Sequence, residues 1–548
     1  MNGLMMDFPL TLNHFLERAG KLFPQEEIVT RLPDRSLHRY TYGDFYRRAR
    51  ALAEALQKAG IRPGDRVATL SWNTYAHLEA YFGIPAAGAV LHTLNLRLHP
   101  SDIAYIINHA EDRFLIVDDV LLGLYQAIQD HVQLERVIVV PLTGQAVPEG
   151  LTNYEDFLAT ATGDFAYPKL EEHAAMGLCY TSGTTGRPKG ALYSHRSTVL
   201  HSLGSALPDT LNLSSRDTLL PVVPMFHVMA WGLPFTGVMA GCKLVMPGPH
   251  LDPVSLLDLY ESERVTKTAG VPTIWLGILQ TLQKEPGRWK LEPMEMVVGG
   301  SAAPEAMIRA FDQFGLKVLH AWGMTEMSPL GTTSRLKRHL LDRPQDEQYR
   351  YRAKQGLPTP LVEVRAVNEQ GEVPWDDQTL GELQVRGPWV ASGYFRLESE
   401  RDKWTEDGWF RTGDVVAIDP EGYVRIADRT KDLIKSGGEW ISSIDLENAL
   451  MSHPAVKEAA VIALPHPKWD ERPLAAVVLK EGMSATPEEL RAHLEPRFAK
   501  WWLPDAFVFL DEIPRTSTGK FMKSRLREQF QGYDWEHQPP AEQAAGEG

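Results

Sequence analysis

Residues 180–190 read Tyr-Thr-Ser-Gly-Thr-Thr-Gly-Arg-Pro-Lys-Gly, and this stretch decides how the fold is interpreted. Apolar runs precede and follow it, at 176–179 and 191–193, so we expect it to form a turn between two strands. Its three glycines allow close approach of the backbone, and its free N–H groups, hydroxyls and lysine suit the oxygens of a polyphosphate. The spacing does not match the Walker A loop in any register. On its own, the stretch is equally typical of a flexible surface loop.

Length and composition predict a soluble protein of several domains. A chain of 548 residues exceeds one ordinary domain, and 43% apolar with 23% charged residues is typical of globular proteins. The net charge of −15 argues against a nucleic-acid or anionic-membrane partner. Cys179 and Cys242 are too few cysteines for a disulfide framework and favour a reducing cytoplasm. The chain shows neither a basic, apolar leader nor a run of about 18 apolar residues, so we expect no signal peptide and no transmembrane segment.

The order of helix and strand signals predicts an α/β fold. Strand–helix alternation in the first half recurs between about residues 176 and 320 and favours two doubly wound units with mostly parallel sheets. Residues 355–427 instead show strand signals separated by Gly, Pro and Asp turns, without an intervening helix, which favours a small antiparallel β part. After Lys431 a compact α+β pattern follows.

These changes of pattern set the expected domain boundaries. We predict a large N-terminal domain over residues 1–428, a linker over 429–434, a small C-terminal α+β domain over 435–532 and a disordered tail over 533–548. Local signals add a helix with Phe45, Ala49 and Leu52 on one face, a helix capped by Ser101, a strand over 243–246, and a helix that starts with a capping box at Thr486 and runs to about residue 498.

Six further motifs combine glycine turns with side chains suited to nucleotide chemistry. A carboxylate oxygen suits Mg²⁺, a carboxylate can bind both ribose hydroxyls, and a lysine can stabilise charge on a phosphate. Each motif alone also fits a plainer interpretation, as a core histidine, a structural turn, a solvated linker or an exposed loop. In chain order they are Pro224-Met-Phe-His-Val228, Val297-Val-Gly-Gly-Ser-Ala-Ala-Pro304, Gly323-Met-Thr-Glu326, Trp409-Phe-Arg-Thr-Gly-Asp414, Asp428-Arg-Thr-Lys-Asp-Leu-Ile-Lys-Ser-Gly-Gly-Glu-Trp440 and Pro514-Arg-Thr-Ser-Thr-Gly-Lys-Phe521.

Together with residues 180–190, these motifs resemble those of the acyl-adenylate-forming enzymes, a superfamily of AMP-binding proteins that includes acyl-CoA synthetases, peptide-synthetase adenylation domains and luciferases. The resemblance covers nearly the whole chain and is closest to bacterial long-chain fatty acyl-CoA synthetases. It implies that the protein uses ATP and Mg²⁺ as cofactors and coenzyme A as a co-substrate. It also implies a small C-terminal domain that is mobile about the linker.

The resemblance assigns one set of residues to the nucleotide and the metal. It makes Glu326 and the Thr181 hydroxyl the Mg²⁺ ligands and Asp414 the ribose residue. Trp322 stands where the family usually has tyrosine, so stacking on adenine is retained but a hydroxyl contact is lost. The implied cofactor-binding residues are Thr181, Ser182, Gly183, Thr184, Thr185, Gly186, Lys189, Val228, Gly300, Ser301, Trp322, Gly323, Thr325, Asp414, Arg429, Lys431, Lys435 and Trp440.

A second set is assigned to the acyl substrate and to catalysis. The resemblance places His227 beside the carboxylate, makes Trp231 the gate of an acyl tunnel that Gly300 borders, and lets Lys520 reach the α-phosphate and the carboxylate. With Glu326 and Thr181, His227 and Lys520 form the implied catalytic set. Lys431 is the implied pivot of the small domain, although some members carry aspartate at the pivot. The loop 435–440 would then meet the nucleotide or the pantetheine channel.

The resemblance implies an ATP-dependent fatty acid–CoA ligase for medium- or long-chain acids. Such an enzyme activates the carboxylate as acyl-AMP, releases pyrophosphate, and passes the acyl group to coenzyme A with release of AMP. The alternatives are an aryl- or short-chain acyl-CoA ligase and an adenylating enzyme that loads a carrier protein. The expected partners are the fatty acid, ATP and coenzyme A, without nucleic acid. The resemblance further implies a homodimer, and the low cysteine count favours the cytoplasm.

Overall fold

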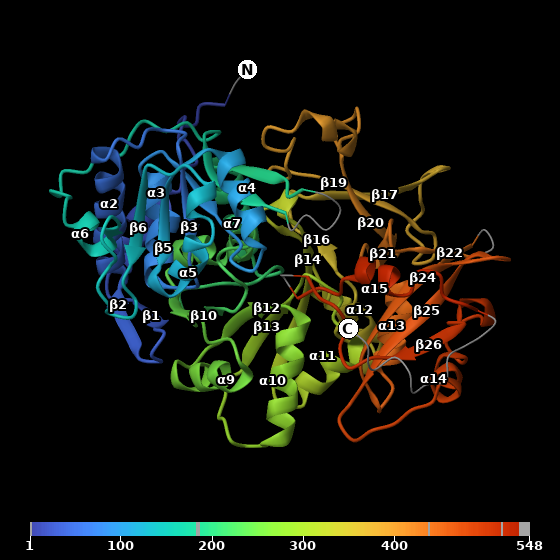
Figure 1. Ribbon diagram of the computed structural model, residues 1–548. Helices are drawn as coiled ribbons and strands as arrows, with labels where there is room; N and C mark the ends of the chain where they lie inside the picture. Colours follow the sequence, from blue (N-terminus) through green and yellow to red (C-terminus); the bar gives the residue numbers. More distant parts are fainter. Residues whose placement is uncertain (1–2, 182–186, 437–438, 517–518, 536–548) are drawn as a thin grey trace.

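The computed structural model describes residues 3–181, 187–436, 439–516 and 519–535. Four β-sheets organise this part of the chain: one of seven strands, one of nine, and two of five (Figure 1). The tail predicted over 533–548 lies largely outside the described residues. In the described part, no helix combines the length and the apolar character needed to cross a membrane.

The seven-stranded sheet belongs to the first doubly wound unit, drawn in blue and cyan in Figure 1. Its strands are β3 (Arg66–Leu70), β4 (Val90–Thr93), β5 (Asp112–Asp118), β6 (Arg136–Val140), β7 (Thr152–Asn153), β8 (Ala175–Tyr180) and β9 (Gly190–Ser194). Their order is β7-β6-β5-β3-β4-β8-β9, parallel throughout except for the antiparallel pair β8–β9. Helices in this part of the chain are α1 (Asn13–Leu22), α2 (Tyr42–Lys58), α3 (Tyr75–Ala86), α4 (Pro100–Ala110), α5 (Leu122–Gln126) and α6 (Tyr154–Leu158).

Local signals explain two of these helices. Helix α2 starts at a capping box between Thr41 and Asp44 and buries Phe45, Ala49 and Leu52, as predicted. The helix expected to be capped by Ser101 begins two residues earlier, at Pro100. Pro100 occupies its first position and the side chain of His99 caps it, because proline is already set at the helical φ.

The nine-stranded sheet forms the second unit. Its strands are β1 (Glu27–Arg31), β2 (Leu37–Thr41), β10 (Thr218–Pro221), β11 (Lys243–Met246), β12 (Lys267–Gly270), β13 (Met294–Val298), β14 (Leu316–Gly323), β15 (Leu330–Thr333) and β16 (Leu357–Pro358), in the order β16-β15-β14-β13-β12-β10-β11-β1-β2. The pairs from β14 to β1 are parallel, and those at both edges are antiparallel. Helices here are α7 (His195–Ala206), α8 (Leu233–Ala240), α9 (Pro253–Ser262), α10 (Pro272–Lys284), α11 (Glu305–Asp312) and α12 (Gln345–Ala353).

An antiparallel sheet follows, as predicted from the strand signals in residues 355–427. It contains β17 (Glu363–Asn368), β18 (Gly371–Glu372), β19 (Gly381–Arg386), β20 (Phe410–Ile418) and β21 (Val424–Arg429), in the order β18-β17-β19-β20-β21. The expectation that no helix intervenes was wrong, because η6 (Glu398–Lys403) forms a short 3₁₀ helix between β19 and β20. Other short 3₁₀ helices are η1 (Asp119–Leu121), η2 (Gln129–His131), η3 (Val228–Gly232), η4 (Thr325–Met327), η5 (Arg338–Leu340) and η7 (Lys500–Trp502).

The last unit is α+β and is drawn in orange and red in Figure 1. Its elements are β22 (Ile434–Ser436), β23 (Glu439–Ile441), α13 (Ser443–Met451), β24 (Val456–His466), β25 (Asp470–Leu479), α14 (Pro487–Leu494), β26 (Ala506–Phe509) and α15 (Lys523–Gln529). The predicted capping box at Thr486 is present, but α14 ends at Leu494 rather than near residue 498.

The architecture confirms the predicted α/β class, with two doubly wound units, an antiparallel β part and an α+β part. Among the described residues, each cluster of buried apolar side chains stays either within residues 10–426 or within residues 434–535. The linker expected over 429–434 connects these two groups of cores, and its role as a hinge remains a prediction.

Candidate active site

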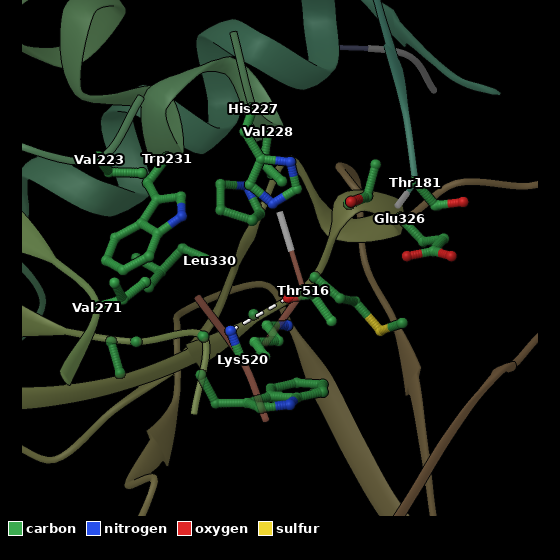
Figure 2. Close-up of a pocket in the computed structure, with 18 of the residues that line it drawn as sticks. Thr181, Val223, His227, Val228, Trp231, Val271, Glu326, Leu330, Thr516 and Lys520 are labelled. Atoms are coloured by element: carbon green, nitrogen blue, oxygen red, sulfur yellow. Dashed lines mark hydrogen bonds between the residues drawn. The ribbon is translucent and has the colours of Figure 1, made fainter. Parts of the chain in front are cut away.

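A cavity of about 610 Å³ opens where the two doubly wound units, the antiparallel sheet and the α+β part meet. Its two ends differ in chemistry. Figure 2 shows a polar side and an apolar side, with His227 and Lys520 between them. The polar side carries Thr181 and Glu326, and the apolar side carries Val223, Trp231, Val271 and Leu330.

The two strands expected on either side of residues 181–189 are present as β8 and β9. Strands β8 and β9 pair in antiparallel fashion, with Tyr180 opposite Gly190. Beyond that pair, the Thr181 N–H donates to the Lys189 carbonyl over 2.9 Å, and the Lys189 N–H donates to the Thr181 hydroxyl over 3.1 Å. The Lys189 ammonium pairs with Glu400 at 2.6 Å. Residues 182–186, which carry five of the predicted phosphate contacts, lie outside the described residues.

Glu326 lies in η4, directly after β14, and is 6% exposed. Its Oε1 accepts a hydrogen bond of 2.6 Å from the Tyr394 hydroxyl. In the described part of the chain, no three potential ligands gather into a complete metal site. The donor set therefore fits Mg²⁺ only as that ion usually binds beside nucleotides, with one carboxylate and with phosphate and water oxygens completing the shell.

A buried carboxylate joins the antiparallel sheet to the cavity wall. Asp414 on β20 is 2% exposed, accepts from the Trp322 indole N–H over 2.8 Å, and pairs with Arg429 Nε at 2.6 Å. Trp322 and Arg429 line the cavity, and Asp414 contacts both of them. The indole N–H of Trp322 is thus engaged with the carboxylate predicted to bind ribose.

The histidine motif is held by a clamp from the first unit. The Asn73 side chain donates to the carbonyls of Pro221 and Val223 over 2.9 and 3.0 Å, and it accepts from the Met225 N–H over 2.7 Å. These bonds fix the backbone two residues before His227. Burial, together with the positive charges of Lys520 and Arg97, lowers the pKa of His227 to about 3. The imidazole is therefore neutral at pH 7 and keeps one N–H to donate.

Directly after this histidine, the backbone makes a left-handed turn. Residues Val228 to Trp231 have φ values from +44° to +57°, which costs about 1–2 kcal/mol for each L-residue. Tertiary contacts hold the turn, including a 3.1 Å hydrogen bond from the Val228 N–H to the Cys179 sulfur. The turn brings the Trp231 ring against Gly299, where an added Cβ would lie 3.0 Å from the indole Cη2.

Lys520 reaches the cavity from the α+β part. Its N–H donates to the Thr516 hydroxyl over 3.1 Å, which is the dashed line in Figure 2. Nearby, Arg515 donates to the Thr273 hydroxyl over 2.9 Å and so joins the α+β part to α10. A Cβ added at Gly300 would lie 3.7 Å from Lys520 Cε, so the lysine passes directly over this glycine. Burial lowers the pKa of Lys520 to about 8.

The cavity brings most of the predicted residues together. Its lining includes Thr181, Lys189, His227, Val228, Trp231, Gly300, Trp322, Gly323, Thr325, Glu326, Arg429, Lys431 and Lys520. Ser301, Asp414 and Lys435 are not part of the lining. The side chain of Trp440 lies outside what the structure describes. Sequence reasoning missed Arg97, Tyr394 and Lys403, which also line it. No charge or glycine pattern marks Arg97 or Tyr394, whereas Lys403 lies in a charged run typical of a solvated surface.

Comparisons with known proteins agree with this geometry. The family model described as AMP-binding enzyme matches residues 16–395, and that described as AMP-binding enzyme C-terminal domain matches residues 445–520. The chain is 53% identical to a long-chain-fatty-acid–CoA ligase of Thermus thermophilus, covering 96% of this chain and 97% of the relative. It is 46% identical to a 3-methylmercaptopropionyl-CoA ligase of Ruegeria pomeroyi, with 97% and 99% covered. The crystal structure of the anthranilate CoA ligase AuaEII with anthranoyl-AMP superposes with a TM-score of 0.85 at 25% identity, over 95% of this chain and 98% of the other.

Proposed function

Because the chain belongs to the family of AMP-binding enzymes, we propose that it is an ATP-dependent fatty acid–CoA ligase for medium- to long-chain acids. It activates a fatty carboxylate as acyl-AMP with release of pyrophosphate, and then transfers the acyl group to coenzyme A with release of AMP. One observation carries the assignment to this site: a single cavity joins a polar end suited to phosphates to an apolar end, with His227 and Lys520 between them.

In the first half-reaction, the acyl chain lies against Trp231 and the other apolar residues, and its carboxylate lies beside His227. The carboxylate oxygen attacks the α-phosphorus in line, and the bond to pyrophosphate breaks. Lys520 stabilises the charge that gathers on the α-phosphate and the carboxylate. The neutral His227 orients the carboxylate by donating its N–H.

The nucleotide is held by residues that lie in three sheets or directly beside their strands. Thr181 and Lys189 bind the phosphates, while Arg429 and Asp414 bind the ribose. Trp322 packs against the adenine and keeps its N–H on Asp414. Glu326 and the Thr181 hydroxyl would hold Mg²⁺, which supplies charge neutralisation on the phosphates when bound.

In the second half-reaction, the coenzyme A thiol attacks the acyl carbonyl and AMP leaves. We propose that the α+β part swings about Lys431 between the two steps, which withdraws Lys520 and brings the loop 435–440 to the cavity. In the arrangement described here, Lys520 lines the cavity and Lys435 does not. This arrangement therefore suits adenylation.

A second candidate function is a ligase for a short acid, such as a thioether acid. It is favoured by the 46% identity to the Ruegeria relative named above. Chain length separates the two candidates, because a short acid would leave much of the apolar end unfilled.

A competition assay tests the proposal. The protein, ATP, Mg²⁺ and coenzyme A are incubated with equal amounts of palmitate, octanoate, acetate, 3-methylmercaptopropionate and 4-coumarate, and the thioesters are identified by mass spectrometry. Palmitoyl- or octanoyl-CoA formed together with AMP supports the fatty acid ligase. A dominant product from one of the other three acids contradicts it, and AMP without any thioester indicates a carrier protein as acceptor.

We also propose a homodimer in the cytoplasm. The cytoplasmic assignment rests on Cys179 and Cys242, which are buried, free thiols. The dimer rests on the family resemblance alone. Light scattering after size exclusion tests it, and a mass near 61.4 kDa would contradict it.

A further inference from the structure

The connector between β19 and β20, residues 387–409, contacts two charged residues that line the cavity. Its Tyr394 hydroxyl donates to Glu326 Oε1 over 2.6 Å, and its Ala391 N–H donates to the Glu326 carbonyl over 2.7 Å. Its Glu400 pairs with Lys189 at 2.6 Å. One connector thus engages the predicted metal ligand and the predicted phosphate lysine.

Resting on the function proposed above, we propose that this connector orients the metal ligand and neutralises the lysine of the triphosphate site before ATP binds. Tyr394 is a positioning residue that orients Glu326 for the divalent cation. Glu400 is the resident counter-ion of Lys189, and the triphosphate must displace it.

The geometry at Glu326 supports the first role. The Tyr394 hydroxyl occupies Oε1, so the other carboxylate oxygen is the one left to face a cation. The Ala391 bond fixes the same residue through its backbone. Partners of this kind orient a metal ligand, and removing one costs about 10- to 100-fold in metal affinity.

The geometry at Lys189 supports the second role. The Lys189 ammonium lies 5.4 Å from the centre of the Tyr394 ring, so the ring and Glu400 share this cation. The two side chains of the ion pair are 24% and 27% exposed, which places the pair in partly screened surroundings. Such a pair is weak enough for a triphosphate of higher charge to replace it.

Binding of ATP without fatty acid tests both roles, because no turnover occurs. Isothermal titration calorimetry measures the ATP affinity in EDTA and at increasing MgCl₂. For Tyr394→Phe, we expect the Mg²⁺ concentration that half-maximally tightens ATP binding to rise by about 10- to 100-fold. The affinity in EDTA should stay unchanged. Tyr167→Phe is the matched control, because Tyr167 donates an equivalent 2.7 Å hydrogen bond to Glu17, and neither residue lines the cavity.

The Glu400→Gln variant tests the counter-ion. We expect it to bind ATP about two- to fivefold more tightly in EDTA at low ionic strength, the range that a partly exposed ion pair contributes. This gain in ATP affinity should become smaller at high salt concentration, because salt screens the charges. Glu398→Gln is the control, because Glu398 lies in the same 3₁₀ helix, is 86% exposed and pairs with Arg401 instead.

The outcomes separate this inference from the function on which it rests. An unchanged Mg²⁺ dependence in Tyr394→Phe overturns the positioning role, and unchanged or weaker ATP binding in Glu400→Gln overturns the counter-ion role. If Tyr394→Phe fails to fold, the Glu400→Gln result still decides the second role, and Glu326→Gln, measured in the same titration, decides whether this carboxylate serves the metal. Wild-type protein that binds no ATP overturns the proposed function itself.

Discussion

The rate of adenylation should fall at alkaline pH, because Lys520 loses its proton within the range of pH in which enzymes are usually assayed. Burial lowers the pKa of this lysine from 10.5 to about 8. The positive charges of Arg429 and Lys431 contribute to this shift, while Asp414 and Glu326 oppose it. Only the ammonium form can stabilise charge on the α-phosphate.

The expected magnitude follows from the protonated fraction. With a pKa of about 8, about 90% of Lys520 is charged at pH 7 and about 10% at pH 9. The kcat/KM for ATP should therefore fall about tenfold between these two pH values, because this ratio reports the free enzyme. His227 does not contribute to this fall in kcat/KM, since its pKa of about 3 keeps it neutral at both pH values.

The assay follows pyrophosphate release at saturating fatty acid and limiting ATP, from pH 7 to pH 10, with circular dichroism as a check of folding. Lys520→Arg is the matched variant. A guanidinium stays charged over this range, so the variant should be slower but lack the alkaline limb. A flat wild-type profile up to pH 10, or an unchanged midpoint in Lys520→Arg, would refute the reasoning.

Two more variants test the cause of the lowered pKa of Lys520 and the half-reaction in which this lysine acts. Arg429→Gln removes a neighbouring cation and releases Asp414 from its 2.6 Å ion pair. Both changes raise the pKa of Lys520, so the midpoint should move to higher pH. Lys520→Ala should cripple adenylation but leave the reaction of supplied acyl-AMP with coenzyme A largely intact. Equal loss in both half-reactions would contradict the assignment.

Three further variants probe the supports of the site. Asn73→Ala breaks the clamp before the histidine motif and leaves buried backbone groups unpaired, so denaturant unfolding should show a loss of about 1–3 kcal/mol, and the KM for the acid should rise more than that for ATP. Gly299→Ala places a methyl 3.0 Å from the Trp231 ring, so the octanoate-to-palmitate ratio of kcat/KM should rise roughly tenfold. Lys523→Met removes the partner of Glu447, which lies at 2.7 Å and whose pKa burial raises to about 7. Unfolding should then show a loss of about 3–5 kcal/mol at pH 8, where Glu447 is ionised, and a smaller loss at pH 5, where it is protonated.

Local sequence signals were sufficient where a single element decides its own structure. The run Lys243–Met246 is short, apolar and bounded by glycine and proline, and it forms β11 as predicted. The capping box at Thr486 starts α14 for the same local reason. The α/β class followed from many such signals in order along the chain.

Features that depend on distant partners could not be read from the sequence. Strand β1 joins the second sheet by pairing Ile28 with Leu244, and no local pattern records a partner more than 200 residues away. The left-handed turn at 228–231 contains no glycine, so propensity argues against it, and only the surrounding packing enforces it. Tyr394 was missed because Glu326, which it contacts, lies 68 residues away.

The charge around the cavity adds to the burial that lowers the pKa of Lys520, and it also bears on ligand binding. The chain carries a net charge of −15, yet the described lining holds two carboxylates, Glu326 and Asp432, and eight cations: Arg97, Arg187, Lys189, Lys403, Arg411, Arg429, Lys431 and Lys520. Cations that outnumber the nearby carboxylates repel one another, which favours the neutral form of the one that can lose a proton. A triphosphate reverses this balance and raises the pKa of Lys520 again. ATP binding near pH 8 should therefore take up about half a proton. Calorimetry in buffers of different ionisation enthalpy measures that uptake, and Lys520→Arg should abolish it; uptake that persists in this variant would assign the proton to another group.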